Sequence, residues 1–517
     1  MSVKEIEKNW DLVVIGGGIT GAGILREAVR NGLKTLLVEQ KDFAWGTSSR
    51  SSKLVHGGLR YLKEGRLMLT RESVKERERL LKEAQGLVEP LDFMLPIFSD
   101  KGPGRWMMEA GLSIYDVIAG KWRHKFYKKE QFCQKVPIVD EKGLLGGFLF
   151  MDAQVDDARL VLRLINEAEE SGGFAANYTR ATKIIRENNG NVTGVLLEDS
   201  ESAEKIEIKT CAIINATGVW AETLHISPEK GKHIRPLRGS HLIFPSEIVP
   251  ITSPVSFFNP EDNRPLFVIP WEGAVLAGTT DIDHQGDLSD EPFISKKEAD
   301  YIISSMKSAF PKLKISLSDC ISTIAGVRPV LSEGKLDPSK ESREHVVWVD
   351  KGLITVTGGK LTTFRALAWD TLKAAKPFLG DIILTGRDEP VFNKVNPSGK
   401  TGKVLTTPQL KRLIGRYGAH AEKIINDSDE SDLEEIPGTR TLWAEIVYAA
   451  TNEKIRHLED LLLRRVRVGL LMENGGKEIL SRVQQLCQPV LDWDDTKWEL
   501  EIEVYINFCA KYYSVPS

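Results

Sequence analysis

The sequence predicts an α/β protein with a Rossmann-like sheet, a region of short antiparallel strands and a helical C-terminal region. Three observations carry this prediction. The apolar run "DLVVI" (11–15) ends in glycines, and a helical pattern follows before the second apolar run "KTLLVE", which is the order of a βαβ unit. Short strands fill 178–215 and 235–290, as expected of a further sheet. Beyond a Pro- and Gly-containing linker at 388–403, the charged sequence has helical periodicity.

The remaining elements are predicted from local patterns. The expected elements, in chain order, are a charged helix over Leu67–Leu81, a separate Pro- and aromatic-rich layer over 91–150, a helix over 155–173 capped by Asp156 or Asp157, a buried strand in "CAIINATG", strands at 346–357 and a helix from Leu361. Two C-terminal segments, "RLIGRYGAHAEKII" and "LEDLLLRRVRVGLL", are interpreted as amphipathic helices that pack on the main body.

The composition excludes several classes of protein. The chain has 517 residues, 41% of them hydrophobic and 27% charged, and a net charge of −4, so we expect two to four globular domains and no nucleic-acid binding. Five scattered cysteines without C-x-x-C spacing indicate neither a metal site nor a disulfide framework, and favour a reducing compartment. We see no signal peptide and no run near the ~18–20 apolar residues that span a bilayer.

The N-terminal glycines indicate a dinucleotide site. Gly16, Gly18 and Gly21 form G-x-G-x-x-G between a strand and a helix, and Glu39 ends the next strand. Such glycines let a pyrophosphate approach the backbone at a helix N-terminus, and the acid accepts hydrogen bonds from a ribose. The alternative is an ordinary strand–helix turn with an incidental acid. Only one such fingerprint occurs, so the sequence does not support a reductase that carries both FAD and NAD.

Two further segments carry chemistry. "SSKLVHGGLRYL" (51–62) gathers lysine, histidine, arginine and tyrosine around two glycines. "VTGGKLTTFR" (356–365) places Lys360 where a helix starts, so that a lysine and a helix N-terminus could stabilise a reduced flavin ring. The structural alternatives are a histidine that packs against a turn, a tyrosine in the core and a solvated lysine.

The chain resembles the FAD-dependent glycerol-3-phosphate dehydrogenase family, within the D-amino-acid-oxidase-like flavoproteins. The resemblance rests on "DLVVIGGGITGAG", "GTSSRSSKLVHGGLRYL", "VDDARLVL", "INATGVW", "RGSHLIFP", "GTTDID", "AGVRPV" and "GGKLTTFR", in family order over about 10–370. It implies a discontinuous FAD-binding domain (1–85, 150–235 and 320–385), a substrate domain (86–149 and 236–319) and a helical C-terminal domain (395–517).

The resemblance also implies roles for individual residues. The implied catalytic residues are His56, Arg328 and Lys360. The implied substrate-binding residues are Arg60, Tyr61, Thr279, Thr280 and Arg343. The implied cofactor-binding residues are Gly16, Gly18, Gly21, Glu39, Thr47, Ser48, Ser52, Lys53, Gly218, Gly358, Gly359, Leu361 and Thr362. No cysteine lies in these blocks, so non-covalent FAD is expected.

Physical chemistry agrees with a phosphorylated substrate. A phosphomonoester carries nearly two negative charges, and arginine suits its oxygens, so Arg60, Arg343 and Arg328 could bind glycerol 3-phosphate. His56 titrates near neutral pH and is the natural base for the C2 hydroxyl. Arg328 and Lys360 would stabilise the developing oxygen charge. Any of these groups could instead act only electrostatically, so the identity of the base stays open.

The electron acceptor and the location follow from the resemblance and from one basic segment. The resemblance suggests a membrane quinone, whereas related oxidases use oxygen; the insertion common in the oxidase branch is not apparent, which favours a dehydrogenase. "KWRHKFYKKE" (121–130) holds five Lys/Arg and three aromatic residues, which suits an anionic membrane surface, although a solvated charged face would look the same. We expect a cytoplasmic protein peripheral to the inner face of the membrane, and the C-terminal helices could form a homodimer contact.

Two competing functions remain. An amino- or hydroxy-acid oxidoreductase of the same superfamily would need one arginine for a carboxylate, whereas this chain offers a cluster of cations. A non-catalytic flavin-binding scaffold has no reason to retain His56, Arg328 and Lys360 together. Substrate profiling and flavin bleaching separate these classes from a glycerol-3-phosphate dehydrogenase.

Overall fold

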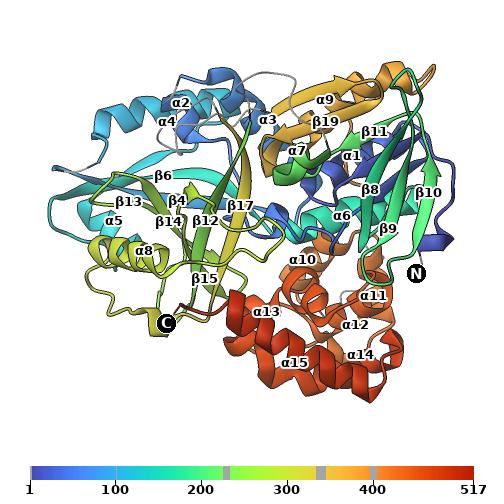
Figure 1. Cartoon of the computed structure of the whole chain (residues 1–517). Helices are drawn as coiled ribbons and strands as arrows, with labels where there is room; N and C mark the ends of the chain where they lie inside the picture. Colours follow the sequence, from blue (N-terminus) through green and yellow to red (C-terminus); the bar gives the residue numbers. More distant parts are fainter. Residues whose placement is uncertain are drawn as a thin grey trace.

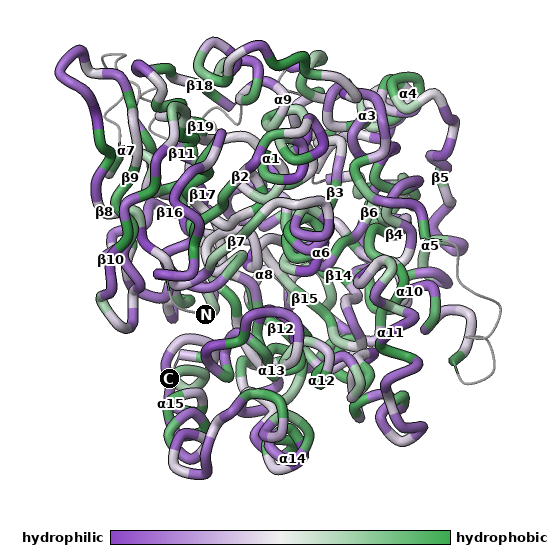
Figure 2. Tube along the Cα trace, turned by 90° about the vertical axis from the view of Figure 1, so that its right-hand side faces the viewer, coloured by the Kyte–Doolittle hydropathy of each residue, from purple (hydrophilic) through white to green (hydrophobic). Residues whose placement is uncertain are grey.

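The computed structural model describes residues 3–63, 65–100, 102–224, 233–332, 345–395 and 405–516, without the side chains of Arg60 and Lys63. Arg343 and the second half of the expected linker lie outside these ranges. Two sheet-based units stand side by side, and the C-terminal helices lie beneath them (Figure 1). The perpendicular view also places α13, α14 and α15 below the sheets (Figure 2), so these helices lie under the main body in both views.

The predicted βαβ unit forms the centre of a six-stranded sheet. Its strand order is β18 (His345–Asp350), β19 (Leu353–Gly358), β11 (Ile213–Asn215), β1 (Leu12–Ile15), β2 (Thr35–Val38) and β7 (Phe174–Ala176). All pairs are parallel except β18 with β19. Every residue of β1 and β2 is buried, as expected of parallel strands covered on both faces.

Three helices build the core against this sheet. They are α1 (Ile19–Arg30), α6 (Asp157–Glu170) and α9 (Phe364–Ala375), and α1 contacts both others. The side chain of Asp156 accepts a hydrogen bond from the Arg159 amide at the start of α6, which confirms the predicted cap. The helix expected from Leu361 starts with a 3-10 turn, Leu361–Thr363, before α9. The three-stranded antiparallel sheet of β8 (Thr179–Arg186), β9 (Val192–Asp199) and β10 (Lys205–Lys209) adjoins this unit.

The second unit is a ten-stranded, mostly antiparallel sheet. Its strands are β16 (Ile282–Asp283), β12 (Ile234–Pro245), β15 (Ala274–Gly278), β14 (Pro265–Trp271), β13 (Val255–Phe258), β4 (Val88–Phe98), β6 (Leu144–Val155) and β3 (Leu54–Val55), with β17 (Ser322–Leu331) on β12 and β5 (Lys125–Lys128) on β6. Strand β17 belongs to the range expected in the FAD-binding domain but pairs with β12 over ten residues. β17 also contacts β19 of the first unit, so the two units meet along β17.

Helices cover the second unit on both sides. α8 (Lys296–Ala309) begins with a capping box of Ser295 and Glu298, and it buries its apolar residues against the large sheet. The shorter helices of this part are α2 (Leu59–Lys63) and α5 (Lys129–Lys135), whereas α7 (Ala221–Leu224) contacts β19 of the first unit. α3 (Leu67–Glu83) coincides with the predicted charged helix.

α4 (Arg105–Ala119) is a surface helix with unusual exposure. The side chains of Trp106 and Val117 are 77% and 71% exposed, although such residues are usually buried. Its inner side is held by Leu112 and Tyr115, which are buried. Across the described ranges, no helix has the length and hydrophobicity that crossing a membrane requires.

The C-terminal region is helical, as predicted, but one segment differs from expectation. Its helices are α10 (Thr407–Tyr417), α11 (His420–Asn426), α12 (Trp443–Asn452), the π-helical turn η10 (Asp460–Arg465), α13 (Val468–Leu471), α14 (Leu480–Leu491) and α15 (Asp495–Tyr512). The interpretation of "LEDLLLRRVRVGLL" as amphipathic is wrong, because all residues of η10 and α13 are buried, arginines included. Each of these arginines has acidic or carbonyl partners inside the protein.

Candidate active site

One large cavity, of about 2080 Å³, lies between the two units and collects most of the predicted site residues. The predicted residues that line it are Gly16, Gly18, Glu39, Thr47, Ser48, Ser52, His56, Tyr61, Gly218, Thr279, Arg328, Gly358, Gly359, Lys360, Leu361 and Thr362. Gly21, Lys53 and Thr280 are not among the lining residues. The Arg60 side chain and Arg343 lie outside the described part of the chain.

The glycine turn after β1 is shaped by close backbone approach. Gly16 has a φ of +114°, and a Cβ there would lie 2.6 Å from the Ala216 carbonyl oxygen. A Cβ at Gly21 would lie 1.9 Å from the Gly16 oxygen, so Gly21 serves the packing of α1 on the turn. The Gly18 and Ile19 amides start α1, and the Ile19 amide donates to Ser48 Oγ at 2.9 Å. The turn therefore brings a helix N-terminus to the cavity wall, which Gly16 and Gly18 line, and this arrangement fits a pyrophosphate.

Glu39 stands beside this turn with both carboxylate oxygens engaged. Oε2 accepts from the Gly17 amide at 2.7 Å and Oε1 from the Lys41 amide at 3.0 Å. Burial raises the pKa of Glu39, and these amides oppose the rise. Each carboxylate oxygen has a second acceptor site, so a ribose hydroxyl is compatible with this arrangement. The residues present thus fit the adenosine and pyrophosphate parts of FAD.

The segment after β2 crosses from the first unit to the second. The Thr47 hydroxyl donates to the Val327 carbonyl of β17, and Ser52 Oγ lies 2.9 Å from His241 Nε2. Lys53 was predicted to bind the cofactor, but its side chain is fully buried below the segment. Its ammonium donates to Asp157 at 2.8 Å and to the Ser49 carbonyl at 2.6 Å. Lys53 therefore supports the segment from behind.

The turn that carries His56 is anchored by a buried polar cluster. The His56 amide donates to Thr362 Oγ1 at 3.2 Å, and the Gly57 amide donates to Asp152 Oδ1 at 3.1 Å. That carboxylate also accepts from Arg77 Nη1 and the Tyr115 hydroxyl, both at 2.6 Å. The cluster leaves the His56 side chain at the cavity, where it is partly exposed.

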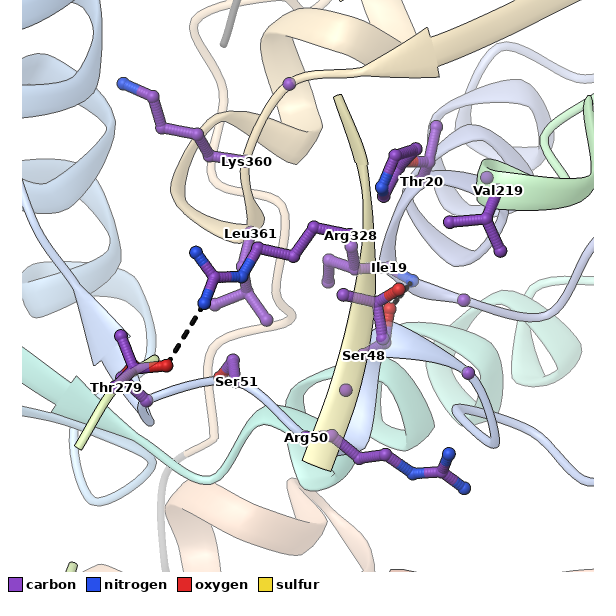
Figure 3. Close-up of a pocket in the computed structure, with 18 of the residues that line it drawn as sticks. Ile19, Thr20, Ser48, Arg50, Ser51, Val219, Thr279, Arg328, Lys360 and Leu361 are labelled. Carbon is purple, nitrogen blue, oxygen red and sulfur yellow. Dashed lines mark hydrogen bonds between the residues drawn. The ribbon is translucent and has the colours of Figure 1, made fainter. Parts of the chain in front are cut away.

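Two of the predicted cations, Arg328 and Lys360, approach the cavity from different elements. Arg328 extends from β17 toward Thr279, whereas Arg50 points to the other side of that strand (Figure 3). Arg328 Nη2 donates to Thr279 Oγ1 at 3.1 Å, and Nη1 lies 3.6 Å from Asp281 Oδ1. A Cβ at Gly239 would lie 1.9 Å from Arg328 Nη2, so a larger residue there would displace this guanidinium.

Lys360 follows β19 at the opposite wall. Its ammonium donates to Ser73 Oγ at 3.0 Å and lies 3.7 Å from the centroid of the Tyr61 ring. Tyr61 is therefore in the wall of the cavity and also packs against a cation. Thr280 turns away from the cavity, because its hydroxyl donates to Glu298 at 2.7 Å and accepts from the Ser240 amide.

Sequence reasoning missed three residues of this site. His241 lines the cavity, and burial, followed by the charges of Arg328 and Lys53, lowers its pKa well below the usual value. Asp281 and Asp152 also line it and orient Arg328 and the His56 turn. His241 and Asp281 lie in the conspicuous blocks "RGSHLIFP" and "GTTDID", whereas nothing local to Asp152 indicates its distant partners.

Comparisons with known proteins agree with this geometry. The family "FAD dependent oxidoreductase" matches residues 11–365, and "C-terminal domain of alpha-glycerophosphate oxidase" matches residues 381–498. The aerobic glycerol-3-phosphate dehydrogenases of Staphylococcus haemolyticus and Staphylococcus aureus are 34% and 32% identical, each over 89% of this chain and 86% and 88% of theirs. A Bacillus halodurans glycerol-3-phosphate dehydrogenase structure complexed with FAD has a TM-score of 0.77 and 27% identity, covering 97% of this chain and 95% of that one.

More distant structures share the fold alone. The L-alpha-glycerophosphate oxidase of Mycoplasma pneumoniae, with FAD bound, has a TM-score of 0.58 and 18% identity, covering 76% of this chain and all of that one. Together, the fold and the site define an FAD-dependent oxidoreductase, which confirms the predicted fold class and cofactor. The chain belongs to the glycerol-3-phosphate dehydrogenase and oxidase family of these flavoproteins, as the sequence resemblance indicated.

Proposed function

We propose that this protein oxidises sn-glycerol 3-phosphate to dihydroxyacetone phosphate and passes the electrons to a membrane quinone. The observation that carries the proposal is one cavity lined by a dinucleotide turn, a histidine and two cations, namely His56, Arg328 and Lys360. The names of the relatives point to the same substrate. FAD, when bound, accepts a hydride at N5. The chain itself must bind the phosphate, hold the C2 hydroxyl and remove its proton.

His56 is proposed to remove the proton from the C2 hydroxyl. Its backbone is fixed by Thr362 and by the Asp152 cluster through Gly57, while its ring faces the cavity. A base held in this way costs little entropy when the substrate binds. Arg328 and Lys360 are proposed to stabilise the oxygen that becomes the carbonyl. His241 is a poor base because it is buried with a lowered pKa.

The phosphate is proposed to bind at cations on the substrate side of the cavity. The sequence assigns Arg60 and Arg343 to this role, and Tyr61 and Thr279 supply the wall beside Arg328 and Lys360. FAD is proposed to bind along Glu39, the glycine turn and the segment 47–52, reaching 358–362 at its ring end. Among the described residues no cysteine lines the cavity, which is compatible with non-covalent binding.

A quinone is proposed as acceptor because the cavity has an apolar wall at the surface helix α4. Met107, Met108 and Ile114 of α4 line the cavity together with Leu59 and Leu62. The same helix exposes Trp106 and Val117 to solvent, so an apolar molecule could pass between a lipid surface and the cavity. Exposed lysines of the predicted basic segment, Lys121, Lys125 and Lys128, follow α4 and suit anionic lipids.

Vesicle flotation tests the membrane proposal. We expect the double variant Trp106→Ser/Val117→Ser to bind anionic vesicles at least about fivefold less than wild type, because two exposed apolar side chains are lost from the proposed lipid contact. Val349→Ser is the matched control, since Val349 is 50% exposed on β18. Equal binding of both variants and wild type would contradict docking through α4.

Anaerobic reduction of the bound flavin tests the reaction. Glycerol 3-phosphate should bleach the oxidised-flavin absorbance near ~450 nm, while glycerol and amino acids should not. Bleaching by amino or hydroxy acids instead would favour an oxidoreductase of that class, and no bleaching with any substrate would favour a flavin-binding scaffold. Rapid peroxide formation in air, without acceleration by a soluble quinone, would favour an oxidase. The domain division and a homodimer remain predictions, the latter tested by light scattering.

A further inference from the structure

Residues 42–53, which we call the cofactor segment, have two faces. Trp45 and residues 46–48 and 50–52 line the cavity, whereas Asp42, Ser49 and Lys53 do not. The segment contains two non-glycine residues in the left-handed region, Ala44 and Lys53, each with a φ of +60°. Such conformations persist only where surrounding contacts fix them. The question is which part of the molecule supplies those contacts.

Asp42 is the first point of contact, and its two arginine partners come from the C-terminal region, while Asn177 Nδ2 also donates to its carboxylate at 3.1 Å. Arg465 donates to both oxygens of the Asp42 carboxylate, at 2.6 and 2.7 Å, and Arg464 Nε donates at 2.5 Å. All three side chains are buried. Arg465 therefore binds the carboxylate in a bidentate manner, and Arg464 adds a third hydrogen bond. Such charge-assisted hydrogen bonds are among the strong ones in proteins.

Ser49 is the second point of contact, and it is held through its carbonyl. Arg467 Nη2 donates to the Ser49 oxygen at 2.6 Å and lies 3.3 Å from Asp157 Oδ1. Asp157 in turn accepts from the Ser51 amide and hydroxyl at 2.9 and 2.7 Å, and from Lys53. Arg467 therefore completes a network that fixes three residues of the cofactor segment.

Arg50 is the third point of contact. Its guanidinium lies 2.6 Å from Glu291 Oε1, and the hydroxyl of Tyr513, just beyond α15, donates to the same oxygen at 2.6 Å. The end of the chain thus reaches the cofactor segment through one intervening carboxylate.

These contacts differ from the other contacts of the C-terminal region in where they end. Elsewhere that region packs through an apolar cluster on the large sheet, including Ile243, Trp271 and Leu276. Its other buried ion pairs, such as Arg159 with Glu453 and Arg416 with Asp156, join it to the start of α6. Burying three arginines is costly unless each is paired, and apolar residues would serve stability as well. Besides partners in the C-terminal region itself, Arg464 and Arg465 each pair with Asp42, and Arg467 binds the Ser49 carbonyl. The segment that carries Asp42 and Ser49 lines the cavity on its other face.

We propose that Arg465 and Arg467 are positioning residues through which the C-terminal region fixes the cofactor segment and so sets the affinity for FAD. We call η10 and Arg467 the C-terminal clamp. The inference rests on the proposed placement of FAD along the segment 47–52. The clamp touches neither FAD nor substrate; it acts by holding the cavity-facing residues in one conformation before the cofactor binds.

Reconstitution of the full-length apoprotein with FAD tests the clamp, with flavin fluorescence as the readout of Kd. Arg467→Met should raise the Kd for FAD at least about tenfold, and Arg467→Lys should raise it less, because part of the charge-assisted contact is kept. Arg163→Met is the matched control. Arg163 is a buried arginine that donates to the Gly415 carbonyl of α10 at 2.6 Å, a contact of the same kind away from the cofactor segment. The Kd of the Arg163→Met variant for FAD should stay within about twofold of wild type.

Hydrogen exchange of the apoprotein gives a readout that needs no cofactor. In Arg467→Lys, peptides over 42–53 should exchange faster, while β9 peptides should not change. Unchanged exchange over 42–53 together with an unchanged Kd would overturn the clamp, as would an equal rise of Kd in Arg163→Met. Glu39→Ala separates the two proposals: a weakened Kd in Glu39→Ala with an unchanged Kd in Arg467→Met overturns only the clamp. An unchanged Kd in Glu39→Ala overturns the placement of FAD, and the clamp with it.

Discussion

Two charged clusters lie on either side of the cofactor segment, and they differ in how far their charged side chains are exposed. In the first, His56, Arg328 and Lys360 face the cavity, and the Arg328 side chain is 24% exposed. In the second, Asp42, Arg464 and Arg465 form ion pairs in which no side chain is more than 1% exposed. An arginine is thus open to a ligand in one cluster, whereas arginines are enclosed by protein in the other.

The difference teaches how to separate binding charges from structural ones. Arg328 contacts the neutral Thr279 hydroxyl and Thr280 carbonyl, with Asp281 at 3.6 Å, so its charge can still act on a ligand in the cavity. Arg465 has its charge matched by a carboxylate on two hydrogen bonds. Changes in the first cluster should therefore alter turnover at constant stability, and changes in the second should alter stability and FAD retention at constant KM.

The largest effect is expected at His56. We predict that His56→Ala lowers the rate of anaerobic flavin reduction by about 10²–10⁴-fold, because a general base contributes that much to proton transfer. The free energy of unfolding should change little, since the turn is held by its backbone. Stopped-flow absorbance and urea unfolding measure the two quantities. A rate loss below tenfold would demote His56 from base to positioning residue.

Arg465 should show the opposite pattern. We predict that Arg465→Met lowers the free energy of unfolding by about 3–5 kcal/mol, because the Asp42 carboxylate loses its bidentate partner inside the protein. KM for glycerol 3-phosphate in FAD-saturated enzyme should stay within about twofold. Arg482→Met is the control: Arg482 forms a partly exposed pair with Asp432 at 3.1 Å, and its loss should cost under about 1 kcal/mol. If urea unfolding gave equal losses of unfolding free energy for Arg465→Met and Arg482→Met, the distinction between enclosed and exposed ion pairs would be contradicted.

Sequence reasoning predicted the first cluster far better than the second. The glycine turn, β1, α1 and the cap of α6 follow from local patterns, because strand burial and helix capping depend on near neighbours. Most of the predicted site residues do line the cavity, since they sit in motifs on loops. Arg464, Arg465 and Arg467 were not predicted, because charge at helical spacing normally means exposure. Asp42, the partner of Arg464 and Arg465, and Ser49, the partner of Arg467, lie more than 400 residues away, and the sequence does not reveal such pairings.

Acid should weaken the enclosed cluster selectively. Burial opposes ionisation of Asp42, but Arg465 and then Arg464 lower its pKa to about 2. A carboxyl with a lowered folded-state pKa contributes stability above its ordinary pKa and loses it as pH falls toward about 2. We predict that about 2 kcal/mol of unfolding free energy is lost this way between about pH 5 and pH 2.

The acid prediction has a direct comparison. Asp42→Asn should be less stable than wild type at pH 7, and the gap should shrink as pH falls in urea unfolding curves, because the wild-type carboxylate is then protonated. Asp427→Asn, at an exposed position, should leave the pH dependence unchanged. A gap between Asp42→Asn and wild type that stays constant down to about pH 2 would contradict a stabilising ion pair at Asp42.

The smallest effects are expected at two adjacent threonines, of which Thr279 lines the cavity and Thr280 lies in the protein interior. Thr279→Val removes the hydroxyl that accepts from Arg328, while the Thr280 carbonyl contact remains, so kcat/KM should fall only about three- to tenfold. Thr280→Val instead breaks buried hydrogen bonds to Glu298 and Ser240 and should cost about 1–3 kcal/mol of unfolding free energy. Its kcat/KM per folded molecule should match wild type. If Thr280→Val lowered kcat/KM and Thr279→Val lowered only the unfolding free energy, the hydroxyl of Thr280 rather than that of Thr279 would face the cavity. The assignment of these two residues to the cavity and to the protein interior would then be wrong.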